Sequence, residues 1–490
     1  MEGQKVANWT LDPSRAGETY SLNPQPNNVM DIFQTGYTLS HNLQVSLGGK
    51  NTQTFFSATS TEASGILPNN NLLRNSALAR ITGNLSDKFT FDTKLSYTRQ
   101  QTDNPTRQSD NNFNPMQQIY TIPRNIRTQD AKNYEFPNSQ GVMQQDFWAP
   151  GVSSTAENPY WVLNRNISND LLGRFTGLVS LKYDFTDDLN LMIRTSYDRI
   201  DDSYEQKDYD GTLVRALYGR YTKTISNNYI FNNDFLLSYK KKFNTDWAMD
   251  VHAGGNSKKL DNESLSSNTG DALLVPNLFS MSNTNLPITT YAPGSPLNIQ
   301  SLYAFGNFSW KDAIYFNLTG RNDWSSTLPA NSRSYFYPSA GVSAILSKLI
   351  PSFPEIFSVA KVRASWAKVG SSPSPFMLQR TASFVSGGTN GFLSLSNVLP
   401  NTNLKPEQTK SFETGFNVGF LEGRLGLDFT YFKTNTVDQL FTIALPVGSG
   451  ASSFFTNGGD IQNKGVEIVL NTVPVQTKDV TWNLDFNFSH

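Results

Sequence analysis

The feature that most constrains the fold is a two-residue alternation of apolar and polar side chains, sustained over stretches of about ten residues. In the stretch 88–97, one parity carries Phe89, Phe91, Thr93, Leu95 and Tyr97, and the other carries Thr90, Asp92, Lys94 and Ser96. Successive side chains of a β-strand point to opposite faces of its sheet. The stretch therefore predicts a strand with one apolar face and one polar face.

The alternating stretches come in pairs joined by short turns. Residues 175–185 and 189–197 carry the pattern on either side of Thr186-Asp187-Asp188, which predicts a hairpin. Similar pairs surround the turns at 48–51, 86–88, 241–245, 311–312, 421–423 and 474–478. These segments predict about 16 antiparallel strands, in about eight hairpins, with roughly 9 to 12 residues in each strand.

The connections alternate in length, because each short turn is followed by a longer segment. The segment between Tyr97 and Phe175 is long and contains several prolines, which loops accept and central strands do not. In an antiparallel meander this alternation places all long loops at one end. Residues 200–228 fit either an extension of a strand or a folded loop.

Strand length and number decide between a soluble sandwich and a membrane barrel. Strands of soluble sheets average about 5 to 6 residues, whereas about ten residues tilted near 45° rise roughly 24 Å, close to the ~25 Å apolar band of outer-membrane barrels. An open sheet with so many strands would expose two unpaired edges, which closure removes. We therefore predict an all-β, antiparallel transmembrane β-barrel with long extracellular loops and short periplasmic turns.

The charged residues indicate which face meets the lipid. Asp92, Lys94, Lys182, Asp184 and Arg194 all lie on the parity opposite to the apolar set. A cation on the lipid face would cost about 2 to 4 kcal/mol at the bilayer midplane, whereas an aqueous or plugged lumen accepts it. We therefore expect the apolar parity to point outward and the charged parity to point into the barrel.

The composition excludes several function classes. The 490 residues carry 40 Lys plus Arg against 41 Asp plus Glu, and the resulting net charge of -1 argues against a nucleic-acid partner. Mean hydropathy is -0.42, and no apolar run approaches the roughly 18 residues that a membrane helix needs. The start of the chain has no apolar stretch typical of a signal peptide.

No catalytic or metal-binding pattern passes a spacing test. The chain has no cysteine, only three histidines and no H-E-x-x-H, G-x-S-x-G or P-loop motif. Asp208-Tyr209-Asp210-Gly211 resembles the start of a calcium loop, but its twelfth position is Gly219 rather than glutamate. We expect no enzymatic activity, no cofactor and no metal site.

The long loops carry aromatic rings beside amide side chains, a combination that suits sugars or peptides. These residues are Trp148, Tyr160 and Trp161 with Asn158 and Asn164 in one loop, and Phe392 with Asn390 and Asn397 in another. Packing of a loop against itself explains any single one of them more simply. We therefore assign no residue as a substrate ligand.

Six segments resemble motifs of one known family. They are His41–Gly49, Arg321–Ser326 ("R-x-D-x-S-S"), Tyr337–Gly341 ("F-P-S"), Lys361–Gly370 ("L-R-A-S-Y-G-x-V-G"), Leu404–Glu407 and Asn463–Glu467. In this order they span most of the chain, and together they are similar to the SusC/RagA family of TonB-dependent outer-membrane transporters. Arg321, Asp323, Asn463 and Glu467 carry the resemblance, and we expect them at strand ends in structural roles.

The resemblance implies a barrel of about 22 strands, preceded by a signal peptide, a small β-sandwich extension, a TonB-contacting segment and a plug domain. Because none of these parts is recognisable before residue 30, we expect residues 1–490 to be a partial receptor barrel that lacks them and the final strands. The resemblance also implies a multi-pass barrel in contact with outer-membrane lipid. It further implies import energised by TonB through the plug, a SusD-like surface lipoprotein as partner, and an oligosaccharide or peptide ligand.

Two other functions remain open on the residues alone. A passive channel or structural outer-membrane barrel would share the same strands without energy coupling. A soluble secreted carbohydrate-binding β-protein would instead bury the apolar parity in a core.

Overall fold

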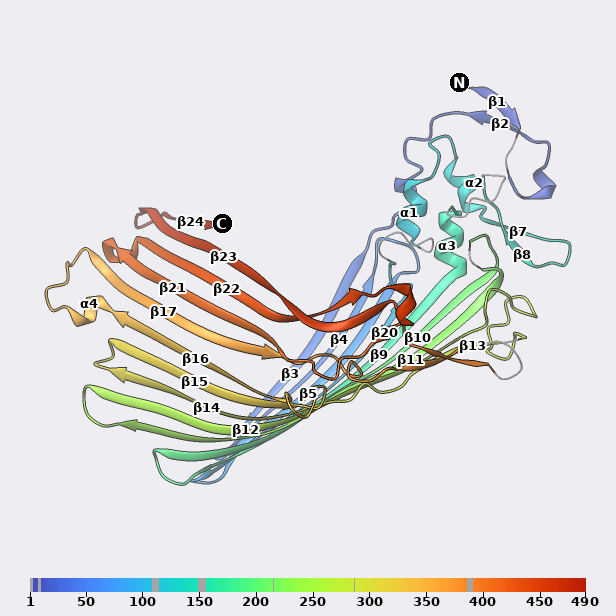
Figure 1. Ribbon diagram of the computed structural model, residues 1–490. Helices are drawn as coiled ribbons and strands as arrows, with labels where there is room; N and C mark the ends of the chain where they lie inside the picture. Colours follow the sequence, from blue (N-terminus) through green and yellow to red (C-terminus); the bar gives the residue numbers. More distant parts are fainter. Residues whose placement is uncertain are drawn as a thin grey trace.

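The computed structural model describes residues 3–7, 10–107, 114–148, 156–214, 216–285, 287–385 and 391–490. Within these residues, eighteen strands share one large sheet (Figure 1), and all but the short β13 (Ile288–Ala292) and β20 (Val398–Leu399) are long. The sixteen long strands are β3 (Tyr37–Gly48), β4 (Thr52–Ser64), β5 (Asn71–Ser86), β6 (Phe89–Asp103), β9 (Asn166–Asp184), β10 (Leu189–Thr212), β11 (Ala216–Lys242), β12 (Trp247–Asn268), β14 (Leu297–Trp310), β15 (Ile314–Ser325), β16 (Ser334–Ile345), β17 (Phe357–Ser371), β21 (Glu407–Phe420), β22 (Leu425–Ala444), β23 (Ser453–Gln476) and β24 (Thr481–Ser489). Their number agrees with the prediction from the hairpin pattern.

The long strands pair in chain order from β3 to β24, and each is antiparallel to the next. The short β13 pairs with the end of β12, and β20 runs parallel to β23. Antiparallel neighbours in chain order need only hairpin connections. The topology is therefore the antiparallel meander that the recurring short turns predict, and Figure 1 shows it as a strongly curved wall.

Exposure distinguishes the two faces of this wall. Ile193, Phe235 and Leu302 share the apolar parity and are 53%, 46% and 55% exposed. Asp234 and Ser301, on the polar parity, are only 9% and 3% exposed. Side chains on the concave face of a curved sheet crowd together, whereas those on the convex face spread apart. The apolar parity is therefore the outward face, as predicted, which excludes a soluble sandwich with that parity in its core.

The connections alternate in length as predicted at most positions. Residues 185–188, 243–246 and 311–313 are short turns at one end, whereas 104–165 and 269–296 are long segments at the other. One connection at the short-turn end differs, because residues 346–356 include the helix α4 (Leu346–Leu349). The long loops still gather at a single end of the barrel.

Residues 200–212 and 216–228 extend the strands β10 and β11. The ladder between β10 and β11 continues to the pair Thr212 and Ala216. These strands have 24 and 27 residues, at least twice the predicted length. The alternation marks only the part that faces lipid, because the outward parity of β10 turns polar after Tyr197, with Arg199 and Asp201.

The largest structure outside the wall stands at the long-loop end, and we call it the loop subdomain. It consists of residues 3–7 and 10–34, which precede β3, together with residues 114–148 and 156–165, which lie between β6 and β9. Its elements are β1 (Gln4–Ala7), η1 (Pro13–Arg15), β2 (Thr19–Leu22), η2 (Met30–Ile32), α1 (Pro115–Tyr120), α2 (Thr128–Lys132), β7 (Glu135–Pro137), β8 (Met143–Gln145) and α3 (Pro159–Arg165). Figure 1 shows them at the upper right, beyond the ends of the strands.

Asn-Pro pairs begin two helices of the loop subdomain. The side chain of Asn114 accepts a hydrogen bond from Met116 N before α1, and the side chain of Asn158 accepts one from Tyr160 N before α3. Asparagine at the N-cap satisfies a free backbone donor, and proline in the next position has its φ already fixed for a helix. Among the described residues, no helix combines the length and the hydropathy that a membrane span requires.

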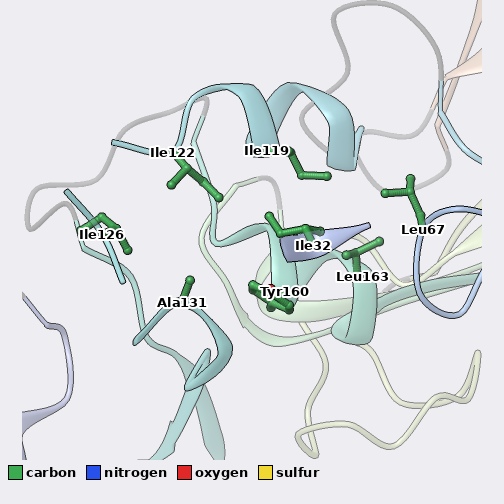
Figure 2. Packing of buried hydrophobic residues seen from close by; sticks show 8 residues of the cluster. All are labelled: Ile32, Leu67, Ile119, Ile122, Ile126, Ala131, Tyr160 and Leu163. Carbon is green, nitrogen blue, oxygen red and sulfur yellow. The ribbon is translucent and has the colours of Figure 1, made fainter. Parts of the chain in front are cut away.

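A hydrophobic cluster holds the loop subdomain together (Figure 2). Its members are Ile32, Leu67, Ile119, Ile122, Ile126, Ala131, Tyr160 and Leu163. Ile32 precedes the wall, Leu67 lies between β4 and β5, and the others come from the segment between β6 and β9. Three separate parts of the chain therefore share one core outside the barrel wall.

Candidate functional site

Arginine–aspartate pairs line the inner face of the wall. They are Arg80–Asp92 (2.7 Å), Arg174–Asp198 (2.5 Å), Arg194–Asp234 (3.0 Å), Arg321–Asp323 (2.8 Å) and Arg363–Asp428 (2.7 Å). Asp92 and Arg194 are among the charges placed in the lumen by their parity, and so are Lys182 and Asp184, which lie 2.9 Å apart. Since each of these paired cations has a carboxylate beside it, this part of the inner wall is polar without a strong field of one sign.

One cluster on this wall is densely hydrogen-bonded. The guanidinium of Arg321 donates to Asp323 Oδ1 and to Ser301 Oγ, both at 2.8 Å, and Tyr337 donates its hydroxyl proton to Asp323 Oδ2. Asp323 is only 6% exposed. The cluster ties β14, β15 and β16 together near the long-loop end of β15.

Only some residues that carry the sequence resemblance lie at strand ends. Asp323 is close to the end of β15, but Asn463 and Glu467 lie in the middle of the long strand β23. The prediction of strand-end positions was wrong for these two, because the alternation in sequence marks only the second half of β23. Both residues are exposed and face inward with Thr430 and Thr434.

Buried and partly buried hydrogen bonds hold residues 10–34 against the segment between β6 and β9. Tyr20 donates its hydroxyl proton to Asn125 O and accepts a hydrogen bond from Arg127 N, both at 2.9 Å. The guanidinium of Arg127 lies 4.7 Å from the centre of the Tyr20 ring. Asn28 donates to the carbonyls of Pro123 and Ile126 at 3.0 and 2.9 Å. The loop subdomain therefore behaves as one folded unit rather than as separate loops.

Buried polar contacts join the loop subdomain to the tip of the β10–β11 hairpin. Trp161 donates its indole N–H to Thr212 Oγ1 at 3.0 Å. The carboxylate of Glu157 accepts from Val214 N at 2.7 Å and from Asn166 Nδ2 at 3.2 Å. Burial raises the pKa of Glu157 to about 8, which its backbone hydrogen bond from Val214 only partly offsets. Glu157 is therefore largely protonated at neutral pH.

The aromatic and amide residues of the long loops fall into two groups. Trp161, Asn158 and Tyr160 are 0%, 1% and 8% exposed, so they fill the interior of the loop subdomain and present no stacking face. Packing of the loop against itself, the simpler reading of the sequence, holds for these three. Phe392 is exposed, whereas Asn390 lies outside the described residues.

The suspected start of a calcium loop lies in a regular strand. Asp208 belongs to β10, is 1% exposed and accepts a hydrogen bond from Gln206 Nε2 at 2.8 Å. Gly219, at the position where a calcium loop needs glutamate, belongs to β11. In the part of the chain that the structure describes, no group of acidic or histidine side chains is arranged to hold a metal ion.

A hairpin in the long segment between β17 and β21 exposes an unusual amount of apolar surface. It consists of β18 (Ala382–Val385) and β19 (Phe392–Leu395), which pair with each other outside the main sheet. Phe384 and Leu393 are 69% and 77% exposed. Exposed apolar surface at the rim of a protein is typical of a contact site for another molecule.

Comparisons with known proteins agree with this architecture. The family model for the TonB-dependent receptor-like β-barrel matches residues 118–490. Over 496 residues, the chain is 25% identical to TonB-dependent receptor P3 of Formosa agariphila, an alignment that covers 96% of this chain and 47% of that protein. Over 499 residues, it is 23% identical to TonB-dependent receptor SusC of Bacteroides thetaiotaomicron, with 94% and 47% covered.

Solved structures show the same fold. The chain superposes on the RagAB peptide transporter with a TM-score of 0.77 at 17% identity, which covers 95% of this chain and 52% of that one. The chain spans about half the length of the curated relatives it matches. The family model and the curated relatives agree with the SusC/RagA resemblance seen in the sequence, and the solved structures agree with its fold. Because the family model covers most of its residues, the chain belongs to the TonB-dependent receptor-like β-barrel family of the bacterial outer membrane.

Proposed function

We propose that this protein is the barrel of a TonB-energised importer that carries nutrient oligomers, either oligosaccharides or peptides, across the outer membrane. The observation that carries the proposal is the family match over residues 118–490, on a wall whose inner face is lined by paired charges. A polar, nearly neutral inner wall suits cargo that hydrogen-bonds strongly and has no uniform charge. An outward apolar face fixes the wall in the membrane.

We further propose that a SusD-type surface lipoprotein contacts the long-loop end. The β18–β19 hairpin supports this, since its apolar side chains project from the rim without belonging to the wall. The related RagAB structures are of an assembly named as a peptide importer. Contact with a lipoprotein would cover Phe384 and Leu393 and remove their apolar surface from water.

The import proposal is tested by uptake in the native organism. Cells with and without the gene for the full-length protein receive fluorescently labelled oligosaccharides and peptides of matched length. We expect one class of oligomer to enter wild-type cells only, and to stop entering when TonB is deleted or a protonophore is added. Uptake that continues at the same rate without TonB would identify a passive channel instead.

The partner proposal is tested by purification of the full-length protein with its associated proteins. Asp in place of both Phe384 and Leu393 should lower the amount of co-purified lipoprotein at least about tenfold, because charged groups resist burial in an apolar contact. The matched control is Asp in place of Leu274, which is 57% exposed in the segment between β12 and β14. Equal recovery of the lipoprotein from all variants would refute the assignment of this hairpin.

A further inference from the structure

The outward face of β3 to β6 contains a groove floored by small residues. Ala58 and Ala77 are directly paired across β4 and β5, and Ala79 lies two residues further along β5. Two adjoining cavities, of about 700 and 380 Å³, lie over this floor and share Leu43, Ala58, Ala77 and Tyr97 among their lining residues. We call this hollow the alanine groove. Clefts that hold small ligands have volumes of roughly 300 to 1,000 Å³.

Large apolar side chains form the two walls of the alanine groove. Phe56 and Val45, which pair across β3 and β4, stand on one side, and Leu95 and Phe175 stand on the other. All of them lie on the parity that points outward, where the barrel meets hydrocarbon. The lower part of the groove is therefore an apolar channel inside the lipid-facing band.

The upper end of the alanine groove is polar and cationic. His41, Ser60, Asn75 and Arg99 form one row across β3, β4, β5 and β6, on the long-loop side of the apolar floor. All but Ser60 are exposed, and all four line the larger cavity. The positively charged side chain of Arg99 thus stands directly above the apolar channel, two residues along β6 from Tyr97.

Within the described residues, Arg99 differs from two other outward-facing cations in that it has no partner of opposite charge. Arg199 is bound to Asp201 at 2.8 Å, and Lys259 lies 5.7 Å from the centre of the Tyr229 ring. Among the residues that the structure describes, no carboxylate lies within ion-pair distance of Arg99. An arginine at the membrane interface without a protein counter-charge is suited to a phosphate group.

We propose that the alanine groove is a binding site for a phosphorylated lipid of the extracellular leaflet, with an acyl chain over the alanine floor and a phosphate on Arg99. The order of surfaces along the groove, apolar below and cationic above, matches the order of parts in such a lipid. The hydrocarbon that surrounds this face makes an acyl chain the natural occupant. The site is separate from the inner wall, so it goes beyond the proposed import function.

The test uses native mass spectrometry of the full-length protein, extracted in a mild detergent and mixed with a phosphorylated lipid A or the same lipid without its phosphates. We expect wild type to retain the phosphorylated lipid at least about fivefold better. Arg99→Gln should abolish this preference. Phe in place of both Ala58 and Ala77 should remove the retained lipid of both kinds, because the rings would fill the hollow.

Matched variants outside the groove control for general effects on the membrane surface. Lys259→Gln removes another outward cation, and Ala340→Phe adds a ring to an exposed outward alanine of β16. Both should retain lipid like wild type. The proposal is overturned if Arg99→Gln keeps the preference, or if the controls lose lipid equally. It is also overturned if the filled groove changes the number of protein copies in the complex and leaves its lipid unchanged.

Discussion

At the scale of single residues, the direction in which a strand side chain points decides which environment it meets. Val179 and Ser180 are neighbours in β9, but Val179 faces outward and is 44% exposed, whereas Ser180 faces inward and pairs with Asp92 and Arg194. Apolar side chains on the outside are stabilised by hydrocarbon, and polar ones on the inside by ion pairs and water. The same substitution at Val179 and at Ser180 should therefore change the stability of the protein by different amounts.

Arginine at these two positions tests the assignment of faces. We expect Val179→Arg to lower the free energy of unfolding of the full-length protein in lipid by about 2 to 4 kcal/mol. Ser180→Arg should lower it by less than about 1 kcal/mol, because the inner wall already holds guanidinium groups. Urea titration of the protein in lipid vesicles, followed by electrophoretic mobility without heating, measures both. Similar losses for the two variants would contradict the outward placement of Val179.

Asp323 is the buried carboxylate of the Arg321–Asp323 ion pair. Its loss should lower the stability of the protein more than the loss of an exposed carboxylate. Asp323→Asn leaves Arg321 partly buried without its counter-charge, and we expect a loss of about 3 kcal/mol in the free energy of unfolding. The control is Asp271→Asn, whose carboxylate is 72% exposed and lies 3.5 Å from Arg220. It should change stability by less than about 1 kcal/mol. The same urea titration compares them, and equal losses would count against a special role for the buried cluster.

At the scale of elements, the loop subdomain is stabilised by its own core and therefore should unfold independently of the wall. Its segments are held by Ile32, Ile119 and their neighbours, and by the hydrogen bonds of Tyr20 and Asn28. The wall is held by continuous ladders between neighbouring strands. A local disturbance in one part need not reach the other.

Trp161→Ala tests this independence. Truncation of a large, fully buried aromatic side chain costs about 3 to 5 kcal/mol, and the indole also loses its hydrogen bond to Thr212. We expect protease cleavage within residues 114–165 to become at least about tenfold faster, while the electrophoretic mobility of the folded barrel stays unchanged. Tyr120→Ala, at a position that is 71% exposed, is the control and should be cleaved like wild type. Simultaneous loss of the folded barrel would show that the two parts are coupled.

Glu157 makes the loop subdomain sensitive to pH. Its pKa is raised from 4.5 to about 8, so between these pH values the folded state binds a proton that the unfolded state has released. The stability that Glu157 contributes is therefore fully present below about pH 4.5 and is lost as the pH rises to about 8, by roughly 1.4 kcal/mol per pH unit at most.

Protease susceptibility measured at several pH values tests this dependence. In wild type, cleavage within residues 114–165 should become faster as the pH rises from 6 to 8.5, after correction for the protease's own pH profile. Glu157→Gln keeps an acceptor for Val214 N and removes the titrating group, so its cleavage should change little over the same range. A pH dependence in the glutamine variant equal to that of wild type would assign the effect to other groups.

At the scale of the whole molecule, the alternation of short and long connections gives the barrel two different ends. The loop subdomain, the tip of the β10–β11 hairpin and the β18–β19 hairpin all belong to the long-loop end. Short turns such as residues 185–188 form the other. Contacts with molecules outside the cell should therefore concentrate at one end only.

Cysteine labelling in intact cells tests this orientation, because the 490 residues contain no cysteine of their own. Ser139→Cys, in the loop subdomain, should react with a membrane-impermeant maleimide added outside the cells. Asp187→Cys, in an exposed short turn, should react only after the outer membrane is permeabilised. The opposite result would reverse the orientation of the barrel in the membrane.

The sequence predicts which side chains of the candidate site point into the barrel, because this direction follows from the two-residue alternation. It predicts no other feature of the site. The inward direction of Arg194 and Asp92 can be read from the alternation, because the period of a strand is fixed by its geometry. Which carboxylate meets which guanidinium depends on the register between neighbouring strands. The alternation within one strand does not reveal this register. The contact of Tyr337 with Asp323 was therefore found only in the structure.

The sequence by itself determined that the chain forms about sixteen antiparallel strands with an apolar outer face, since two-residue periodicity and turn residues are local properties. Only the tertiary structure decided that the loops form a core of their own, in which Tyr20 bonds to Asn125 across 105 positions of the chain. It also decided that Trp161 is buried in that core and that Ala58, Ala77 and Ala79 lie side by side in a groove. These outcomes depend on contacts between distant segments, and no local pattern of residues encodes them.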